Sequence, residues 1–370
     1  MKVFITGATG FVGSRFASRM AQTEHDLYCL VRKTSKVGHL KEIGANLVYG
    51  DVTDKASVLE GMRGCDWVVH LAGIYSLWEP DNSIFTDVNV TGTRNVMESA
   101  LETGVSKVVQ TSTIAVYGRQ EGARDTYEDA YRTHLNSRYS RTKYQADMIC
   151  WSLYAKADLP VVFVYPGSVL GAGDNKPSGE YIENVARRRM PMQILADFYN
   201  TFVYVGDVAE AILKTLEKPD NIGAKYPLGN GEVTWRELTK MISEIAGVRK
   251  PFIPIPNWLL TYISLWTTWY ADMLNITPEP ILNFYSRSLT WYAKLLKRIP
   301  GPLFSYFSEM ARLFADWIDS RRPLYGLSIG TVGTIKRDLL FDGGKAEKEL
   351  GLTYTPLREA LEEEIAQYVA

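Results

Sequence analysis

The sequence predicts an α/β fold in which helices cover both faces of a doubly wound, parallel sheet. Apolar segments of strand length alternate with helix-length segments along the first part of the chain, a pattern typical of parallel strands joined by crossover helices. A glycine-rich turn follows the first apolar segment directly, and polar residues follow the later ones. The expected strands cover residues 3–5, 27–31, 46–51, 67–73 and 107–113.

Composition limits the partners and the compartment. The chain has 370 residues and a net charge of −1, so it lacks the basic excess that a nucleic-acid partner requires. Cys29, Cys65 and Cys150 lie far apart without metal-ligand spacing, so we expect reduced, buried thiols, no metal site and a cytoplasmic location. The first residues predict a strand, so we expect no signal peptide, and no run of about 18 apolar residues predicts a membrane span.

The first strand leads into a turn that contains three glycines, each three residues after the last. Glycines at a strand-to-helix junction allow a tight turn and let a diphosphate approach the backbone N–H groups of the helix N-terminus. The alternative is an ordinary turn, but the position between a strand and a helix is the one that dinucleotide binding requires. The residues predicted to hold the cofactor here are Gly7, Thr9, Gly10, Phe11 and Val12, with Gly13 as the third glycine.

The residues after the second and third strands indicate which cofactor binds. Arg32 and Lys36 stand where an NAD-selective site carries an acidic side chain, and an arginine at that place accommodates a 2′-phosphate. We therefore expect NADP(H) to be preferred over NAD(H), although a solvated basic loop is the alternative. Asp51 and Val52 follow the third strand, where the carboxylate is well placed to meet the adenine amino group.

The fourth and fifth strands also end in candidate site residues. Leu71, Ala72 and Gly73 form a small-residue turn that could run beside the cofactor, and the fifth strand ends in hydroxyls at Thr113. Ligands of such sheets bind beyond the carboxyl ends of the strands, so these positions are expected to meet along one edge. His70 is interpreted as a core histidine rather than a catalyst.

Tyr139 and Lys143 are four residues apart, so on a helix they share a face. A free tyrosine has a pKa of about 10, which is too high for a general base at neutral pH. A neighbouring ammonium and the positive ring of an oxidised nicotinamide would lower that pKa. We predict that Tyr139 exchanges a proton with a substrate oxygen, that Lys143 lowers the tyrosine pKa and binds the ribose, and that Thr113 holds the oxygen.

In combination, these motifs resemble the extended short-chain dehydrogenase/reductase family, also called the NAD-dependent epimerase/dehydratase superfamily. The resemblance covers residues 1 to about 250 and returns near 336 to 370. It rests on the three glycines, Asp51, the turn at 71–73, Asn89, Thr113 and the Tyr139/Lys143 pair, and on segments 165–169, 202–209 and 345–354. It implies a Rossmann-type core in which Tyr165, Pro166, Gly167 and Ser168 lie near the nicotinamide.

Departures from the family pattern narrow the reaction. Nucleotide-sugar 4,6-dehydratases of the family carry an Asp-Glu pair directly after the catalytic threonine, where this chain has Ile114 and Ala115. Many nucleotide-sugar enzymes have an asparagine in the 165–168 region, where this chain has Pro166, Gly167 and Ser168. Many also have an arginine just before position 202, where this chain has Asn200-Thr201. The segment 70–78 and the arginine at the end of the second strand, Arg32, resemble three branches of the family. These are the dihydroflavonol 4-reductase, 3β-hydroxysteroid dehydrogenase and hopanoid-associated epimerase-like branches, whose substrates are less polar or poorly defined.

An insert at about 257–335 departs from the family pattern. Residues 257–271 carry no charge and many Trp and Tyr side chains, and further aromatic residues continue to Trp317. The interspersed basic residues are Lys294, Lys297, Arg298, Arg321 and Arg322. One interpretation is a helical cap on the substrate lobe or a homodimer interface, which we favour; the other is attachment to a membrane surface. Either one suits a hydrophobic substrate.

These observations predict an NADP-binding domain over residues 1–165, which also receives parts of 200–230, and an interleaved substrate lobe over 166–370. The predicted reaction is hydride transfer between the nicotinamide of NADP(H) and a ketone or secondary alcohol of a rather hydrophobic substrate. A nucleotide-sugar epimerase with tightly bound NAD(P) and a non-catalytic NADP-sensing protein are the alternatives. The residues predicted to contact the substrate are Tyr75, Thr113, Ile114, Tyr139 and Ser168.

Overall fold

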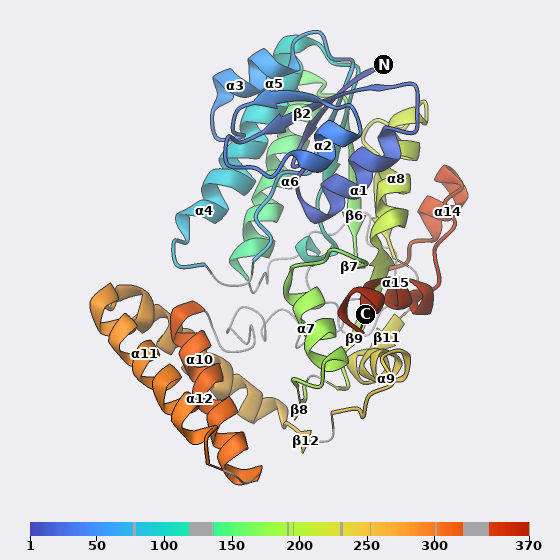
Figure 1. Ribbon diagram of the computed structural model, residues 1–370. Helices are drawn as coiled ribbons and strands as arrows, with labels where there is room; N and C mark the ends of the chain where they lie inside the picture. Colours follow the sequence, from blue (N-terminus) through green and yellow to red (C-terminus); the bar gives the residue numbers. More distant parts are fainter. Residues whose placement is uncertain are drawn as a thin grey trace. The chain divides into compact units, whose positions relative to one another are not determined.

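Seven parallel strands form the main sheet of the protein, whose computed structural model is shown in Figure 1. Their order is β10-β6-β5-β4-β1-β2-β3, so the chain starts inside the sheet and winds outward in both directions. The predicted doubly wound, parallel sheet is therefore confirmed. The strands are β1 (Lys2–Thr6), β2 (Asp26–Val31), β3 (Asn46–Tyr49), β4 (Trp67–His70), β5 (Lys107–Thr111), β6 (Val161–Pro166) and β10 (Lys225–Leu228).

The structure describes residues 1–76, 79–117, 135, 137–190, 192–194, 196–229, 232–251, 253–299, 302–320 and 340–369. The chain divides into two compact units. The larger unit comprises Met1–Ser76, Asn82–Pro254 and Ile335–Ala370, and the smaller one, called the helical unit below, comprises Leu77–Asp81 and Ile255–Thr334. The boundary at residue 165 between a cofactor domain and a substrate lobe stays a prediction.

Alternating side chains of β1 enter two separate hydrophobic cores, one on each face of the sheet. Val3 and Ile5 belong to one core, and Phe4 belongs to the other, as the two-residue period of a strand requires. The first core is covered by α1 (Phe11–Met20), α8 (Val205–Glu217) and α14 (Gly344–Leu350), and the second by α3 (Lys55–Met62), α5 (Thr93–Thr103) and α6 (Arg138–Ala157). All three cysteines are buried free thiols, as expected.

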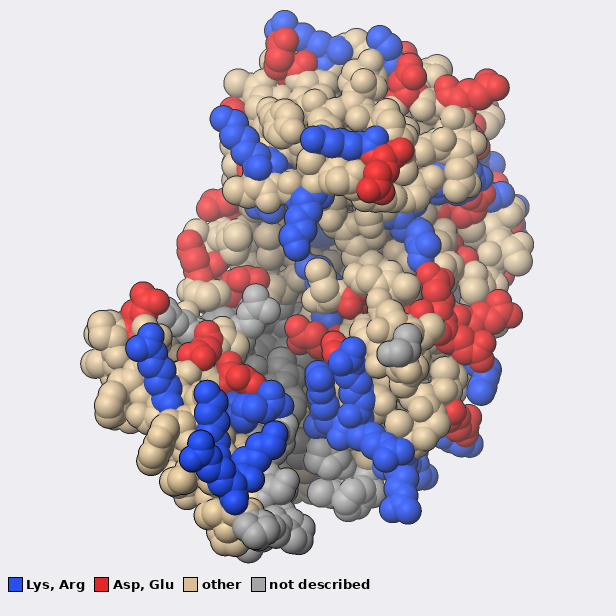
Figure 2. Space-filling model, in the orientation of Figure 1, with Lys and Arg blue, Asp and Glu red and all other residues tan. Residues whose placement is uncertain are grey.

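Smaller sheets and shorter helices complete the larger unit. A three-stranded sheet has the order β11-β9-β7, and β8 pairs with β12. These elements are β7 (Ser168–Leu170), β8 (Met192–Gln193), β9 (Tyr199–Tyr204), β11 (Glu232–Thr234), β12 (Ile253–Pro254), α2 (Gly38–Glu42), α4 (Ser83–Thr86), α7 (Pro177–Ala186), α9 (Trp235–Ile245) and α15 (Leu357–Val369). Figure 2 shows charged side chains of both signs interspersed on the visible face of this unit, in keeping with the net charge of −1.

The helical unit consists mainly of α10 (Asn257–Ile276), α11 (Glu279–Leu296) and α12 (Pro302–Ser320). Leu274, Leu282 and Ile318, one from each helix, form its small core. Within the described ranges, none of the helices combines the length and the hydrophobicity that a membrane crossing needs. Of the residues named in the sequence for this region, Trp78, Arg321 and Arg322 lie outside the described residues, as does the side chain of Trp317.

Candidate active site

The turn between β1 and α1 is as tight as its three glycines predict. Gly7 has a φ of +76°, and a Cβ atom added to it would lie 2.6 Å from the backbone nitrogen of Ala72. A Cβ on Gly13 would lie 2.0 Å from the carbonyl oxygen of Gly7. Gly10 N donates to the same oxygen at 2.9 Å. These contacts fit the roles of the first and third glycines of a dinucleotide-binding turn, which close the turn and let the helix pack tightly.

The first turn of α1 is open to a ligand. Gly10 occupies the N-cap position, so no side chain caps the helix. Thr9 and Gly10 are exposed. Phe11 and Val12, which begin the helix, are half-buried. Backbone N–H groups at such a terminus attract phosphate. The residues present therefore fit a dinucleotide diphosphate.

The predicted adenosine-side residues follow strands next to β1. Arg32 and Lys36 come directly after β2 and are exposed. Asp51 follows β3, and its Oδ1 atom accepts hydrogen bonds from the backbone and hydroxyl of Thr53 at 2.9 and 2.8 Å. Val52 is buried. The strand order β1-β2-β3 places these residues at the same sheet edge as the glycine turn.

The turn after β4 is fastened to β1. Leu71 N donates to the Thr6 carbonyl at 3.1 Å, and Ala72 N donates to the Thr6 hydroxyl at 3.2 Å. His70 is buried between the hydroxyls of Thr6 and Thr93, at 2.7 and 3.0 Å. Burial, together with the positive charge of Lys143, lowers the pKa of His70 to about 3. The interpretation of His70 as a core histidine is confirmed.

Thr113 lies beyond β5 rather than within it. The strand was expected to continue to residue 113 but ends at Thr111, because the chain then turns into a short 3₁₀-helix, Ile114–Val116. The Thr113 hydroxyl caps that helix by accepting from Ala115 N at 3.2 Å. The side chain of Ile114, predicted as a substrate contact, is buried in the core. Its contact with a substrate stays a prediction.

Helix α6 begins immediately before Tyr139. Ser137 and Ser140 form a reciprocal capping box, in which each side chain accepts a hydrogen bond from the other's backbone N–H. This pairing fixes the helix start and therefore the direction in which the first turn presents its side chains. Tyr139 lies in that first turn and Lys143 lies one turn further on, as the four-residue spacing predicted.

Lys143 joins helix α6 to the strand ends. Its buried ammonium donates to the Thr111 carbonyl at 2.7 Å. A Cβ added to Gly73 would lie 4.0 Å from the same nitrogen, so the lysine lies beside the turns after both β4 and β5. Burial lowers the pKa of Lys143, while the negative charge of Asp147 opposes that shift.

Tyr139 meets two of the predicted residues. The Thr113 side chain lies close enough to the phenol to lower its pKa, and the Tyr139 ring contacts the ring of Tyr75 with centroids 4.9 Å apart. Burial raises the pKa of Tyr139, Tyr75 raises it further, and only the Thr113 side chain among the larger influences lowers it. The pKa was expected to fall. The groups of the chain itself raise the pKa instead, because loss of solvent disfavours the charged phenolate.

Asn89 holds the loop after Gly73 against α6. Its Oδ1 atom accepts from Ile74 N at 2.7 Å, and its Nδ2 atom donates to the Ile74 carbonyl at 3.2 Å and to the Thr142 hydroxyl at 3.0 Å. Asn89 is buried in a π-helical turn, Asp87–Gly92, that precedes α5. Such widened turns often occur at functional sites. Here it positions the residue that orders the loop carrying Tyr75.

Asp147 is a buried acid that sequence reasoning missed. It lies one turn after Lys143 on α6, and its Oδ2 atom accepts from the Ser112 hydroxyl at 2.8 Å. Burial raises its pKa to about 7, whereas Lys143, Ser112 and Tyr165 oppose that rise. The sequence does carry a signal for this acid. Tyr139, Lys143 and Asp147 follow one another at intervals of four residues, which places all three side chains along one face of the helix.

The predicted nicotinamide-side segment crosses from β6 to β7. Tyr165 is fully buried, and Gly167 N donates to the Leu228 carbonyl at 2.8 Å. A Cβ on Gly167 would lie 2.5 Å from the Thr201 carbonyl, so the crossing requires glycine. Ser168 accepts a hydrogen bond from Asn200 Nδ2 at 2.6 Å. Pro166 ends β6. The cofactor and substrate contacts of these residues stay predictions.

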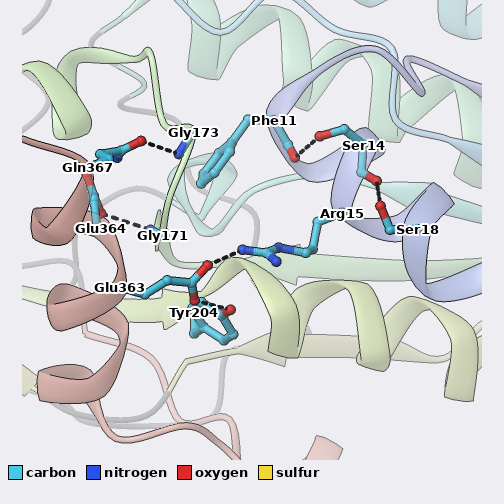
Figure 3. A network of polar contacts seen from close by, with 10 residues as sticks. All are labelled: Phe11, Ser14, Arg15, Ser18, Gly171, Gly173, Tyr204, Glu363, Glu364 and Gln367. Atoms are coloured by element: carbon cyan, nitrogen blue, oxygen red, sulfur yellow. Dashed lines mark hydrogen bonds and ion pairs between the residues drawn. The ribbon is translucent and has the colours of Figure 1, made fainter. Parts of the chain in front are cut away.

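Helix α15 anchors the loop that follows β7 (Figure 3). Glu364 accepts from Gly171 N at 2.9 Å and Gln367 accepts from Gly173 N at 3.2 Å. Glu363, one residue before Glu364, binds both Arg15 of α1 and the Tyr204 hydroxyl. The helix thereby ties α1 to the loop that follows β7.

Comparisons with known proteins agree with this geometry. Residues 3–229 match the model of the family described as "NAD dependent epimerase/dehydratase family". A Synechocystis protein named "Putative dihydroflavonol 4-reductase" is 30% identical over 69% of this chain and 76% of its own length. "Sterol demethylase protein B" of Methylococcus capsulatus is 29% identical over 72% of this chain and 80% of its own. The crystal structure of gox2253 superposes with a TM-score of 0.75 and 29% identity over 99% of this chain and 97% of that one.

Proposed function

Because the chain belongs to the NAD-dependent epimerase/dehydratase family, we propose that it transfers a hydride between the nicotinamide of NADP(H) and a ketone or secondary alcohol. It is an enzyme of an oxidoreductase family with an NAD(P)-binding fold, and its relatives include reductases and epimerases. The NADP preference, the hydrophobic substrate and the roles of single residues are the proposed parts.

The observation that carries the proposal is the position of Tyr139 in the first turn of α6, one turn before the buried Lys143 and beside Thr113. Two neighbouring hydroxyls can both contact one substrate oxygen, which is the arrangement that proton exchange at a carbonyl requires. Burial raises the Tyr139 pKa, so the phenol holds its proton at neutral pH. This state supports ketone reduction, in which Tyr139 donates the proton while the bound cofactor supplies the hydride.

Lys143 would contribute a fixed positive charge beside the site. Its hydrogen bond to the Thr111 carbonyl holds the ammonium at the ends of β4 and β5. From there it can hold ribose hydroxyls and stabilise the phenolate after the proton has left Tyr139. We propose Lys143 as ribose anchor and Tyr139 as proton donor and acceptor, with Thr113 holding the reacting oxygen.

The choice of NADP rests on Arg32 and Lys36. Both are exposed at the end of β2, next to the glycine turn, and a guanidinium there can bind a 2′-phosphate through two parallel hydrogen bonds. Asp51 at the end of β3 would accept from the adenine amino group through its second carboxylate oxygen. Leu71, Ala72 and Gly73 would lie beside the cofactor.

A rather hydrophobic substrate is supported by the residues around Tyr139. The Tyr75 ring packs against it, and Ile114 stands where the family's eliminating enzymes carry an acid. One relative is named for sterol demethylation, and another is named as a ketoreductase of a farnesyl-bearing quinoline oxide. We propose a ketone or alcohol with a large apolar body.

Epimerisation of a nucleotide sugar is the second candidate, because one relative is a UDP-glucose 4-epimerase of Streptomyces lividans. An epimerase returns the hydride to the same carbon, so it consumes no NADPH in steady state. A protein that only senses NADP would bind the cofactor equally well without Tyr139. Substitution of that residue therefore distinguishes the sensor from both enzymes.

The test is NADPH oxidation measured against a panel of ketones and aldehydes, including steroid-like and lipid-like ones, with a UDP-sugar as control. Tyr139→Phe should lower turnover at least about 100-fold while the Kd for NADPH stays unchanged. Tyr144→Phe, on the same helix, is the matched control and should keep full turnover. Undiminished turnover in Tyr139→Phe would remove the tyrosine from the mechanism.

A further inference from the structure

Helix α10 has two apolar faces on opposite sides. Leu260, Ala271 and Leu274 are buried. The opposite face carries Trp258, Tyr262, Leu265, Trp266 and Trp269, with 64%, 66%, 48%, 49% and 60% of their surfaces exposed. Their spacing of three and four residues places them on one stripe of the helix. A helix that only capped a core would carry polar residues on that stripe.

Helix α11 repeats this arrangement. Leu282, Ala293 and Leu296 are buried on one face. The exposed large side chains recur at helical intervals on another face: Ile281, Phe284, Tyr285, Trp291, Tyr292 and Leu295. We call the exposed aromatic and aliphatic side chains of α10 and α11 the outer apolar face. The two helices therefore present to solvent a surface richer in Trp and Tyr than the core of the unit.

This exposure is concentrated in one unit of the protein. Elsewhere among the described residues, the exposed large hydrophobic side chains are Met1, Tyr49, Tyr199, Ile222 and Val369, which lie scattered over the larger unit. Scattered apolar side chains are normal on protein surfaces, but a set gathered along one stripe of a helix, as on α10 and again on α11, marks a binding surface. The outer apolar face therefore requires an occupant.

Charge identifies that occupant. Arg287 and Lys294 are seven residues apart on α11, so they border the side that carries Phe284 and Trp291. Arg298 follows in the turn after the helix, and we call these three residues the α11 cations. On the helical unit, at the lower left of Figure 2, Lys and Arg side chains gather below several Asp and Glu side chains and beside uncharged surface. Cations along the border of an apolar, Trp-rich stripe complement anionic headgroups above an acyl layer.

Two acids of α12 are paired within the helical unit. Asp319 accepts from the Ser286 hydroxyl at 2.7 Å, and Asp316 pairs with Arg312 at 3.8 Å. A symmetric contact between two copies would bring the same α11 cations of both copies to one interface without acids from α11 beyond Glu279 to balance them. An anionic surface meets no such repulsion.

We propose that the outer apolar face of α10 and α11 binds to the surface of a membrane that contains anionic lipid, without crossing it. The aromatic side chains enter the headgroup region, where Trp and Tyr are favoured, and the α11 cations contact the lipid phosphates. This inference goes beyond the proposed function, because attachment does not depend on hydride transfer. It would place the enzyme where apolar ketones and alcohols concentrate.

The test is co-sedimentation of the full chain with vesicles of phosphatidylcholine, with and without phosphatidylserine. Binding should be at least about tenfold tighter with phosphatidylserine and should weaken as salt rises. The variant W258S/W269S/W291S should lose binding to both vesicles. Its matched control, Y199S/I222S/V369S, removes three exposed apolar side chains from the larger unit and should bind as the unchanged chain does.

A second pair of variants tests the charge. R287E/K294E/R298E should reduce binding to the anionic vesicles about 100-fold or more, whereas K41E/R63E/K156E, on the larger unit, should reduce it far less. Retained NADPH binding and an unchanged Tm show that each variant is folded. Absence of binding to either vesicle by the unchanged chain overturns the proposal. So does a dimer, measured by light scattering, that W258S/W269S/W291S converts to monomer.

Discussion

The Asp147 carboxylate accepts a hydrogen bond from the Ser112 hydroxyl at 2.8 Å and so joins the middle of α6 to the end of β5. Ser112 directly precedes Thr113, and Asp147 lies one turn after Lys143. A buried acid thus stands behind the proposed proton-exchanging pair. Its charge supports that of Lys143, whose pKa burial alone would lower.

Replacing Asp147 should change how activity depends on pH. Burial raises the pKa of Asp147 to about 7, so the carboxyl gains a proton as pH falls through neutrality and then stops supporting the Lys143 charge. Asp147→Asn should lower kcat about tenfold at pH 8, leave the Kd for NADPH within about twofold, and remove the change in kcat near pH 7. The measurement is a kcat profile from pH 5.5 to 9.

Asp158→Asn, at the exposed C-terminus of the same helix, is the matched control and should keep the profile of the unchanged enzyme. The other groups facing Asp147, namely Lys225, Tyr165 and Ser112, stay in place in both variants. If Asp147→Asn keeps the change near pH 7, that change belongs to another group.

A methyl group at Gly13 should disrupt the glycine turn. The added Cβ would lie 2.0 Å from the Gly7 carbonyl oxygen, so the backbone must move. Gly13→Ala should lower the free energy of unfolding by about 1 to 3 kcal/mol and weaken NADPH binding at least tenfold. Thermal unfolding and fluorescence titration measure the two effects. At Gly38, where nothing lies within 4 Å of an added Cβ, alanine should change neither.

Arg32→Ala should change cofactor preference. The loss of a charge-assisted pair with a 2′-phosphate should raise the NADPH Kd about 10- to 100-fold, while the NADH Kd changes little. Lys33→Ala, at the neighbouring exposed position, serves as control and should alter both Kd values equally and weakly. An equal loss of NADPH and NADH affinity in Arg32→Ala would mean that the loop at the end of β2 does not bind the 2′-phosphate.

Glu364→Gln should stabilise the protein at alkaline pH. Burial, with the added effect of the Asp174 and Glu363 charges, raises the pKa of Glu364 to about 8 from an ordinary value of 4.5. The folded state therefore keeps a proton that the unfolded chain releases above about pH 4.5, so stability falls as pH rises from there to about 8.

Glutamine still accepts from Gly171 N and carries no proton to lose. Relative to the unchanged protein, Glu364→Gln should gain about 1 to 4 kcal/mol of unfolding free energy between pH 5 and pH 9. Urea unfolding at both pH values measures the gain, and the exposed Glu362→Gln should show none. A difference that is the same at both pH values would show that Glu364 does not titrate in this range.

Features carried by short spacings were predictable from the sequence. The glycine turn, the strand ends at Arg32 and Asp51, and the Tyr139/Lys143 face of α6 depend on neighbouring residues, whose pattern the chain displays directly. Tertiary contacts were not predictable. The raised pKa of Tyr139 comes from burial and from Tyr75, 64 positions earlier, and the anchoring of Gly171 comes from α15.

The sequence shows the helical unit as an aromatic segment, but it does not show which of the aromatic side chains are exposed. Composition alone left open whether Trp258 and Trp291 were core or surface residues. Both are exposed, because Leu274 and Leu282 on other faces of the helices already fill the small core. Periodicity shows that a helix has an apolar stripe, but a helix with two such stripes needs the structure to decide which one is inside.

The chain position of the helical unit bears on how the family diversifies. Every strand of the main sheet ends by residue 228, and apart from Leu77–Asp81 the unit is one continuous segment from Ile255 to Thr334. The nucleotide-binding framework is thus encoded almost entirely apart from the aromatic helices. A segment arranged in this way can be lengthened, shortened or exchanged as a module during evolution, which would change where an enzyme resides in the cell without altering the reaction it performs.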